Sequence, residues 1–299
     1  VAGLYMGTEG SPRLSDFGST ESFDAYAFGE ALSGWLEPLR LISSPPFQVG
    51  WYNETRDATA GGVSRISAPD GAIAFAAYSV PQYLDVIVEH FARAKPESNF
   101  VDATTDEIIE RLQAQLMPEL DAYIANTDTG PPYYHVQTIG AVAGVDQHLE
   151  AADVMEDKEE DREWLNDLGD ELQETRDPKM WGTDPATTRK VFGVNVHPTW
   201  GGWYGYRFLI VLRGVHVDRC SPELKRPSML NFLDRDEAKR ILSEYNLRHE
   251  LCLWRDLSAT AHPADRRYSP AEYFFFMEQS PLKRKRYLEL QASHFAEPP

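Results

Sequence analysis

The stretch WYGYRFLIVLRGV at residues 203–215 constrains the fold most, because its middle is a run of large apolar side chains. Phe208 to Leu212 predict a strand buried near the centre of a sheet. A second apolar run, GAIAFAAYSV at 71–80, follows the turn signal Pro69-Asp70-Gly71. Since 42% of the 299 residues are hydrophobic, the chain can build a core around both strands.

We expect the strands to be grouped in hairpins, with helices before, between and after them. One hairpin joins 47–54 to 71–80, and a second joins 190–196 to 203–215 through Gly201 and Gly202. Apolar periodicity predicts helices over 21–42, 81–94, 105–120, 235–247 and 269–290, the last broken at Pro281. This order predicts an α+β fold, with an antiparallel sheet and flanking helices, rather than a parallel doubly wound sheet.

The charge and composition exclude several partners. The 47 acidic residues against 29 basic ones give a net charge of −18, which would repel the backbone of a nucleic acid. No run of about 18 apolar residues occurs, so we expect no membrane span. The two cysteines have no metal-binding spacing, which predicts a reducing, cytoplasmic setting without a disulfide framework or a zinc site.

The domain organisation that we expect is simple. Residues 1–20 lack periodicity and predict a disordered leader, and 21–299 predict a single domain. About half of the excess negative charge falls within 150–177, which we interpret as a solvated helix. Its thin apolar stripe consists of Trp164, Leu165, Leu168 and Leu172.

The common motifs of sequence-readable enzyme classes are missing. The chain has no glycine-rich dinucleotide fingerprint, no P-loop, no HExxH motif and no nucleophile elbow. Its eight histidines show no metal-ligand spacing, so we expect no metal held by protein side chains.

Arg207 is a candidate binding residue at the start of the apolar strand. In an extended strand Trp203, Gly205, Arg207 and Leu209 share one face. Gly205 would leave a notch in which the guanidinium could bind a carboxylate through two hydrogen bonds. The alternative is a salt bridge at the edge of the sheet.

A second unusual feature is a small-residue ridge within 135–154. Gly140, Ala141, Ala143 and Gly144 would lie close together if this segment is helical. Such a ridge indicates either close packing of a helix on the sheet or a broad ligand lying against it.

Several unusual strings occur in an order that resembles the cobalamin-processing proteins of the CblC type, the MMACHC family. The most specific are FQV-x-WYNE from Phe47, QT-x3-VAG from Gln137 and HP-x2-GGW from His197. LWRD at 253–256 and RRYSPAEYFF at 266–275 continue the pattern, so the resemblance spans most of 22–290. It implies a fold similar to the flavin-dependent nitroreductases, holding a corrinoid, with an acidic insertion at about 155–178.

The resemblance implies vitamin B12 processing. Members bind cobalamin with its lower base detached and remove its upper axial ligand. Alkylcobalamins are dealkylated by transfer of the alkyl group to glutathione. Cyanocobalamin is decyanated reductively with FAD or FMN or a flavoprotein reductase. The resemblance implies that the bond changes occur at the cobalt of the substrate, so no side chain is assigned as catalytic.

Two other functions stay open, and the resemblance also implies partners. One alternative is a cobalamin carrier that hands its cargo to a trafficking partner with little turnover. The other is a flavin reductase or nitroreductase on the same scaffold. The partner implied is a CblD-type cobalamin-trafficking protein, with the chain itself a monomer or a ligand-linked homodimer.

The resemblance also assigns site residues. Arg207 and Arg284 match arginines that hold glutathione. The positions that match corrin contacts are Asn126, Tyr134, His135, Val136, Gln137, His148, Leu149, Glu150, Asn195 and Tyr206.

At several of these positions the chain departs from the better-known members. Asn195 replaces a cysteine, His148-Leu149-Glu150 replaces a Tyr-Tyr-Gln run, and Ala141 replaces a histidine. A further glutathione-site arginine, near Ala259–Thr260, is not retained, and Leu257 replaces a tryptophan.

Overall fold

The computed structural model describes residues 14–19, 22–59, 63–97, 99–116, 122–126, 134–156, 158–181, 183–258, 266–278 and 280–295. Its centre is an antiparallel sheet with the strand order β3-β5-β9-β6, in which β4 also pairs with β5. Every residue of β5 is buried, as is most of β9, which matches their apolar sequences. The strands are β3 (Leu41–Ser43), β4 (Phe47–Gln48), β5 (Ala72–Ser79), β6 (Ala122–Asn126) and β9 (Gly205–His216).

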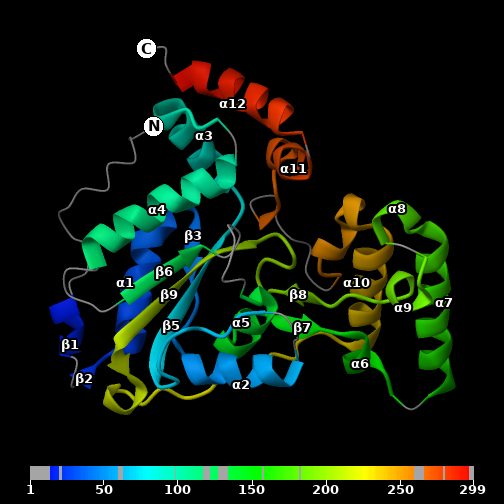
Figure 1. Ribbon diagram of the computed structural model, residues 1–299, viewed down its shortest axis with the longest axis horizontal. Coiled ribbons are helices and arrows are strands. Elements are labelled where there is room, and N and C mark those ends of the chain that lie inside the picture. The colour runs from blue at the N-terminus through cyan, green and yellow to red at the C-terminus, as the bar shows by residue number, and fades with distance from the viewer. Residues whose placement is uncertain are drawn as a thin grey trace.

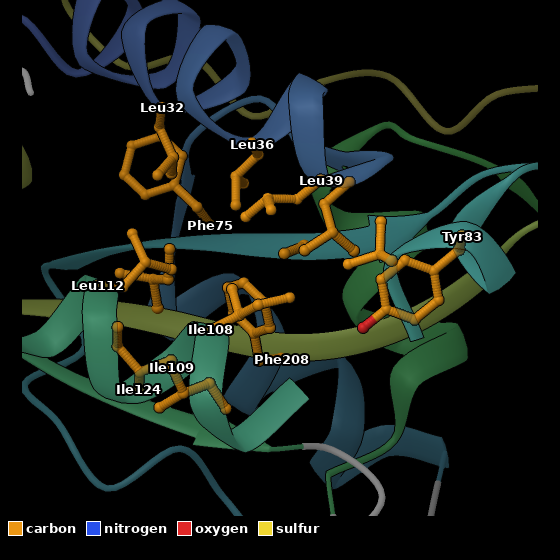
Figure 2. Close-up of a cluster of buried hydrophobic side chains, with 14 of the residues drawn as sticks. Leu32, Leu36, Leu39, Phe75, Tyr83, Ile108, Ile109, Leu112, Ile124 and Phe208 are labelled. Carbon is orange, nitrogen blue, oxygen red and sulfur yellow. The ribbon is translucent and has the colours of Figure 1, made fainter. Parts of the chain in front are cut away.

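Helices cover one face of this sheet and bury the larger core. They are α1 (Ala25–Leu36), α3 (Tyr83–Ala94) and α4 (Phe100–Leu116), and α12 (Pro281–Phe295) packs on α3 (Figure 1). Figure 2 shows Leu32 and Leu36 of α1, Phe75 of β5 and Phe208 of β9 within this cluster. Burying side chains of this size contributes roughly 1.5–3 kcal/mol each.

The opposite face of the sheet carries α2 (Val49–Thr59) and α5 (Val136–Ala143). Ala74, Ala76 and Val211 of the sheet pack against Tyr52 of α2 and Ile139 of α5. The small alanines of β5 let these helices approach closely. This face continues toward the candidate site.

A side lobe lies beyond α5, on the right of Figure 1. Its two-stranded ribbon pairs β7 (Gln147–Leu149) with β8 (Val194–Val196). Its helices are α6 (Ala151–Val154), α7 (Glu159–Thr175), α8 (Pro178–Trp181), α9 (Pro185–Thr188) and α10 (Arg235–Leu247), followed by η4 (His249–Leu251) and η5 (Leu253–Arg255). The chain then returns through α11 (Pro270–Met277) to α12.

The predicted antiparallel sheet with flanking helices is confirmed, with two corrections to the hairpins. The segment 47–54 is a strand only at Phe47–Gln48 and then becomes α2, because Val49 and Tyr52 lie three residues apart on a buried helix face. The segment 190–196 contains β8, which pairs with β7 and not with β9. Both edges of β9 are already taken, by β5 and β6.

Most of the predicted helices are present. Those expected over 21–42, 81–94, 105–120 and 235–247 correspond to α1, α3, α4 and α10, and the break at Pro281 separates α11 from α12. Residues 14–19 fall within the predicted disordered leader but form the short η1 (Leu14–Phe17) and β1 (Gly18–Ser19), where Phe17 packs on Phe28. The rest of that segment, 1–13 and 20, lies outside the described residues.

The acidic segment 150–177, expected as one helix, forms the short α6 and the longer α7, and a buried carboxylate anchors α7. Leu168 and Leu172 of the expected apolar stripe are buried. Asp161, fully buried, pairs with Arg235 and Lys239 of α10. Since a buried carboxylate is stable only when paired, these ion pairs hold α7 against α10.

Two findings concern membrane spans and metal sites. In the part of the chain that the structure describes, no helix is long and apolar enough to cross a membrane. Among the same residues, no group of three or more His, Cys, Asp or Glu side chains is placed to hold a metal ion.

Candidate functional site

An open cleft of about 240 Å³ lies between the central sheet and the side lobe. One wall, which we call the network wall, comes from α5, β8, the start of β9 and the residue before it. It consists of Val136, Gln137, Val194, Asn195, Tyr204 and Tyr206. The other, which we call the arginine wall, comes from α10, η4 and η5 and consists of Tyr245, His249, Trp254 and Arg255, with Gly202 at its edge. The cleft therefore combines aromatic surface with a few polar groups, as ligand sites generally do.

Asp146 organises the network wall from beneath. Its side chain, in the short turn between α5 and β7, is 1% exposed. Tyr204 and Tyr206 each donate a hydroxyl hydrogen bond of 2.5 Å to Oδ2, and Asn195 Nδ2 donates one of 2.6 Å to Oδ1. One carboxylate thus fixes three residues of the wall through charge-assisted hydrogen bonds.

The network continues from Asn195 toward the surface. Its Nδ2 also donates to the carbonyl of Gln137 at 3.0 Å, and its Oδ1 lies 2.6 Å from Nδ1 of His148. Nε2 of His148 lies 3.1 Å from Oε1 of Glu150. Because the amide nitrogen of Asn195 donates twice, its oxygen accepts, so Nδ1 of His148 is the donor of this hydrogen bond.

Burial shifts the pKa values of this wall. The pKa of Asp146 is raised to about 6 by burial, although the hydrogen bonds from Tyr204, Tyr206 and Asn195 oppose the shift. The pKa values of both tyrosines are raised well above the usual range, first by burial and then by the charge of Asp146. Near neutral pH the tyrosines are therefore neutral donors, and Asp146 is the group that titrates.

The arginine wall is built differently, around Arg255. Its guanidinium carbon lies 4.4 Å from the ring centroid of Trp254, 5.6 Å from that of Trp203 and 5.7 Å from that of Tyr268. Nη1 donates to the carbonyl of Gly202. Three rings and one carbonyl thus hold the cation at the cleft.

Gly202 explains why this wall fits against the central sheet. A side chain there would lie 2.4 Å from the Trp254 ring and 2.9 Å from Cγ of Arg255. The amide of Gly202 also donates to the carbonyl of Arg255 at 2.9 Å. The GGW and LWRD strings therefore dock on each other. The space beside Gly202 is therefore filled by Trp254 and Arg255.

Arg207 lies on the other face of the sheet, beside α3 and α11. The β5–β9 register shifts between Ala77 and Tyr78, so Phe208 pairs with Ala77 and Tyr206 with Tyr78. The resulting β-bulge turns Arg207 toward the larger core, whereas Leu209 faces the α5 side. The expected shared face of Gly205 and Arg207 is confirmed, and its extension to Leu209 is wrong.

The surroundings of Arg207 are tight. Its side chain is 9% exposed, Nε donates to Ser79 Oγ at 2.9 Å, and its guanidinium carbon lies 5.1 Å from the Tyr83 ring. A methyl group on Gly205 would lie 3.1 Å from Nη2. The notch predicted at Gly205 exists, and the guanidinium itself fills it.

The second predicted glutathione-site arginine, Arg284 of α12, shares a neighbour with Arg207. It donates through Nη2 to the carbonyl of Phe276 at 3.3 Å and through Nε to that of Glu278. The ring of Phe276 has its centroid 6.0 Å from the guanidinium carbon of Arg207. Two residues far apart in sequence are thus brought to the same end of α11.

The structure places the predicted corrin-contacting residues unequally. Val136, Gln137, Asn195 and Tyr206 line the cleft, and His148 and Glu150 adjoin it through Asn195. His135 lies next to His148, with 6.4 Å between their ring centroids. Tyr134 and Leu149 are buried in hydrophobic clusters, and Asn126 ends β6 opposite Phe208.

The small-residue ridge supports close packing. At Gly140 a methyl group would lie 1.8 Å from the Tyr206 hydroxyl, so this glycine makes room for the network. Ala143 is fully buried, and Gly144 ends α5 with a φ of +67°. Ala141 and Gly144 keep part of their surface exposed.

Sequence reasoning missed Asp146 and the arginine wall. Asp146 belongs to no motif and stands as an isolated acid between Val145 and Gln147. Arg255 stands within LWRD, and the docking of this string on GGW could not be seen along the chain. The region of the missing arginine, Ala259–Thr260, lies outside the described residues.

Comparisons with known proteins agree on one family. A family model described as "Methylmalonic aciduria and homocystinuria type C family" matches residues 42–288. A Bos taurus protein named "Cyanocobalamin reductase / alkylcobalamin dealkylase" is 26% identical over 239 residues, which is 77% of this chain and 71% of the relative. A Gallus gallus protein of the same name is 25% identical over 268 residues, covering 87% and 95%.

A solved structure resembles the whole architecture. It is described as a C. elegans B12-trafficking protein CblC, a human MMACHC homologue, and aligns with a TM-score of 0.62. The alignment covers 88% of this chain and 94% of that one at 19% identity, so it supports the fold.

Proposed function

The chain belongs to the methylmalonic aciduria and homocystinuria type C family, and from this we propose that it processes vitamin B12. It binds cobalamin with the lower base detached and removes the upper axial ligand. This makes it an alkylcobalamin dealkylase and a cyanocobalamin reductase, the activities in the names of its relatives.

One observation carries the proposal. Val136, Gln137, Asn195 and Tyr206, assigned to corrin contacts from three separate segments, line a single cleft. A corrin is a broad ring rimmed with amides, so it needs aromatic surface beside hydrogen-bonding groups. The network wall supplies both, with its polar groups held in place before a ligand arrives.

The cobalt of the substrate supplies the reactive centre, and the chain's residues bind and orient the corrin. In dealkylation the sulfur of a thiolate attacks the alkyl carbon, a C–S bond forms, and the electron pair of the Co–C bond stays on cobalt. In decyanation an electron supplied by reduced FAD or FMN, or by a flavoprotein reductase, reduces Co(III) to Co(II) and cyanide leaves.

We propose glutathione as the thiol, held by Arg207 and Arg284 at the end of α11. The two arginines reach Phe276 from opposite sides, one at its ring and one at its carbonyl. A carboxylate would have to displace part of these contacts. Binding therefore requires the two arginine side chains to exchange some of their present contacts for the carboxylate.

Arg207→Ala tests this role. We expect glutathione-dependent dealkylation of methylcobalamin to weaken by about 2 kcal/mol in kcat/KM, with cobalamin affinity nearly unchanged, because a charge-assisted pair to the thiol substrate is lost. Equal loss of both would show that Arg207 supports the fold instead. The exposed Arg93→Ala serves as the control for removing an arginine.

A cobalamin carrier with little turnover is the second candidate. The observation in its favour is that Arg207 is buried against Ser79, Tyr83 and Phe276. Steady-state formation of several equivalents of product per protein would exclude it.

Further parts of the proposal rest on the resemblance alone. They are a sheet of the flavin-dependent nitroreductase type, docking to a CblD-type trafficking protein, a monomer or ligand-linked homodimer, and an acidic insertion at 155–178. A cytoplasmic location is proposed from composition, and both cysteines are free thiols.

The test of the proposed function is spectroscopic. Methylcobalamin is added anaerobically to the purified protein and its visible spectrum recorded, and glutathione is then added. A blue shift followed by formation of cob(I)alamin supports binding and dealkylation, and a blue shift alone supports the carrier. No shift at all would contradict the proposal.

A further inference from the structure

Arg255 is a cation in the cleft without an acidic partner among the residues that the structure describes. Its one side-chain hydrogen bond goes to the carbonyl of Gly202, and its other contacts are with aromatic rings. No ion pair joins Arg255 to any of the described carboxylates, although the chain carries 47 acidic residues.

Acidic residues do lie near Arg255, but they pair with other groups. Asp256, the next residue, accepts from Trp203 Nε1 at 2.8 Å and lies 2.9 Å from Nε of Arg267. Arg240 on the same lobe is paired with Glu237 and Glu244. The acids around Arg255 are thus committed elsewhere.

Two donors beside the cleft are left without acceptors in the described part of the chain. They are Nε of Arg255 and Nε1 of Trp254, both buried. Trp254 is only 5% exposed, and leaving a buried donor unpaired is destabilising. Donors of this kind, on residues that line a cleft, indicate an acceptor that arrives with a ligand.

We propose that Arg255 and Trp254 form an oxyanion-binding subsite of the cleft. The inference rests on the proposed function and names the ligand chemistry of a wall to which no role had been assigned. Two oxyanions are available in that reaction: the phosphodiester in the nucleotide tail of cobalamin, which leaves the cobalt when the base detaches, and a carboxylate of the thiol co-substrate. A guanidinium is planar, which suits two-pronged binding of either group.

The experiment compares matched probes with and without the oxyanion. Methylcobalamin carries the phosphodiester, whereas methylcobinamide lacks the nucleotide tail. Glutathione carries carboxylates, whereas 2-mercaptoethanol has none. Kd values for the two corrinoids and KM values for the two thiols are measured for the wild type, Arg255→Gln and Arg255→Lys.

A phosphodiester site predicts that Arg255→Gln weakens methylcobalamin binding about tenfold or more and leaves methylcobinamide unchanged. A carboxylate site predicts that Arg255→Gln raises the KM for glutathione about tenfold or more and leaves the KM for 2-mercaptoethanol unchanged. In either case Arg255→Lys, which keeps the charge, should retain part of the affinity. The remote Arg93→Gln on α3 should change none of these values.

Two results would overturn the inference. An equal loss for all four probes, together with a lowered melting temperature, would mean that Arg255 only docks η5 on Gly202. No loss for any probe would mean that the cleft binds no anion there. If the wild type bound neither corrinoid, the proposed function itself would fail, and the inference with it.

Discussion

The two walls of the cleft satisfy their polar groups in opposite ways. On the network wall the polar contacts form a closed set around Asp146, with donors from Tyr204, Tyr206 and Asn195. On the arginine wall a cation rests on rings, and two buried donors lack acceptors within the described residues. A closed network holds a shape, whereas open donors select a ligand.

This difference between the two walls also separates the source of binding affinity from the source of ligand specificity. A prearranged wall lowers the entropic cost of binding, whatever amide-rimmed ring arrives. An open guanidinium discriminates by charge, because leaving it unpaired is costly once the cleft is filled. The predictions below test this division, beginning with the largest effect.

Asp146→Ala should break the network wall. Three donors lose their shared acceptor and a small cavity forms, so the free energy of unfolding should fall by about 3 kcal/mol or more. Cobalamin affinity should fall about tenfold or more as Tyr206 and Asn195 lose their positions. Urea unfolding and spectral titration measure the two, and the exposed Asp167→Ala on α7 is the control. Unchanged affinity in a stable variant would contradict the positioning role.

The ionisation of Asp146 should make stability depend on pH. Its pKa is raised from 3.8 to about 6, so the folded state binds a proton more tightly than the unfolded state. This contribution is fully present below about pH 4 and is lost as the pH rises through about 6, by at most about 3 kcal/mol. The difference in unfolding free energy between wild type and Asp146→Asn, followed from pH 4 to pH 7.5, isolates it. A difference independent of pH would contradict the assignment.

A pair of glycine substitutions can disturb each wall separately. Gly140→Ala pushes against Tyr206 and Asp146, and Gly202→Ala pushes against Trp254 and Arg255. Each should cost about 1–3 kcal/mol of stability through overpacking. We expect Gly140→Ala to weaken the binding of methylcobalamin and of methylcobinamide equally. Gly202→Ala should weaken the binding of the probe that carries the oxyanion more than the binding of its counterpart without it. The same pattern in both variants would remove the distinction between the walls.

Glu150→Gln should have the smallest effect. The carboxylate lies at the exposed rim, where its contact with His148 is screened by water. Stability should change by less than about 0.5 kcal/mol. Chemical unfolding checks the stability, and a larger loss would place the strength of the network at the rim rather than at Asp146.

The sequence predicted the sheet better than the cleft, for a physical reason. Burial on both faces is encoded locally, so β5 and the apolar half of β9 could be read from their composition. The bulge that turns Arg207 away from Leu209 depends on the register with β5, which no local pattern contains.

The cleft depends on contacts between distant segments. Asp146 becomes the shared acceptor of the network only because Tyr204, Tyr206 and Asn195, which are 49 to 60 residues away in the sequence, donate hydrogen bonds to it. The strings HP-x2-GGW and LWRD were visible separately, and their docking at Gly202 was not. The resemblance supplied residues of the network wall, whereas the arginine wall emerged from the fold alone.

The most direct test of the account is a crystal structure of the protein with methylcobalamin bound. The account predicts a corrin ring in the cleft, with Asn195 and Tyr206 on one side and Trp254 and Arg255 on the other. A corrin bound elsewhere, with this cleft unchanged, would contradict it.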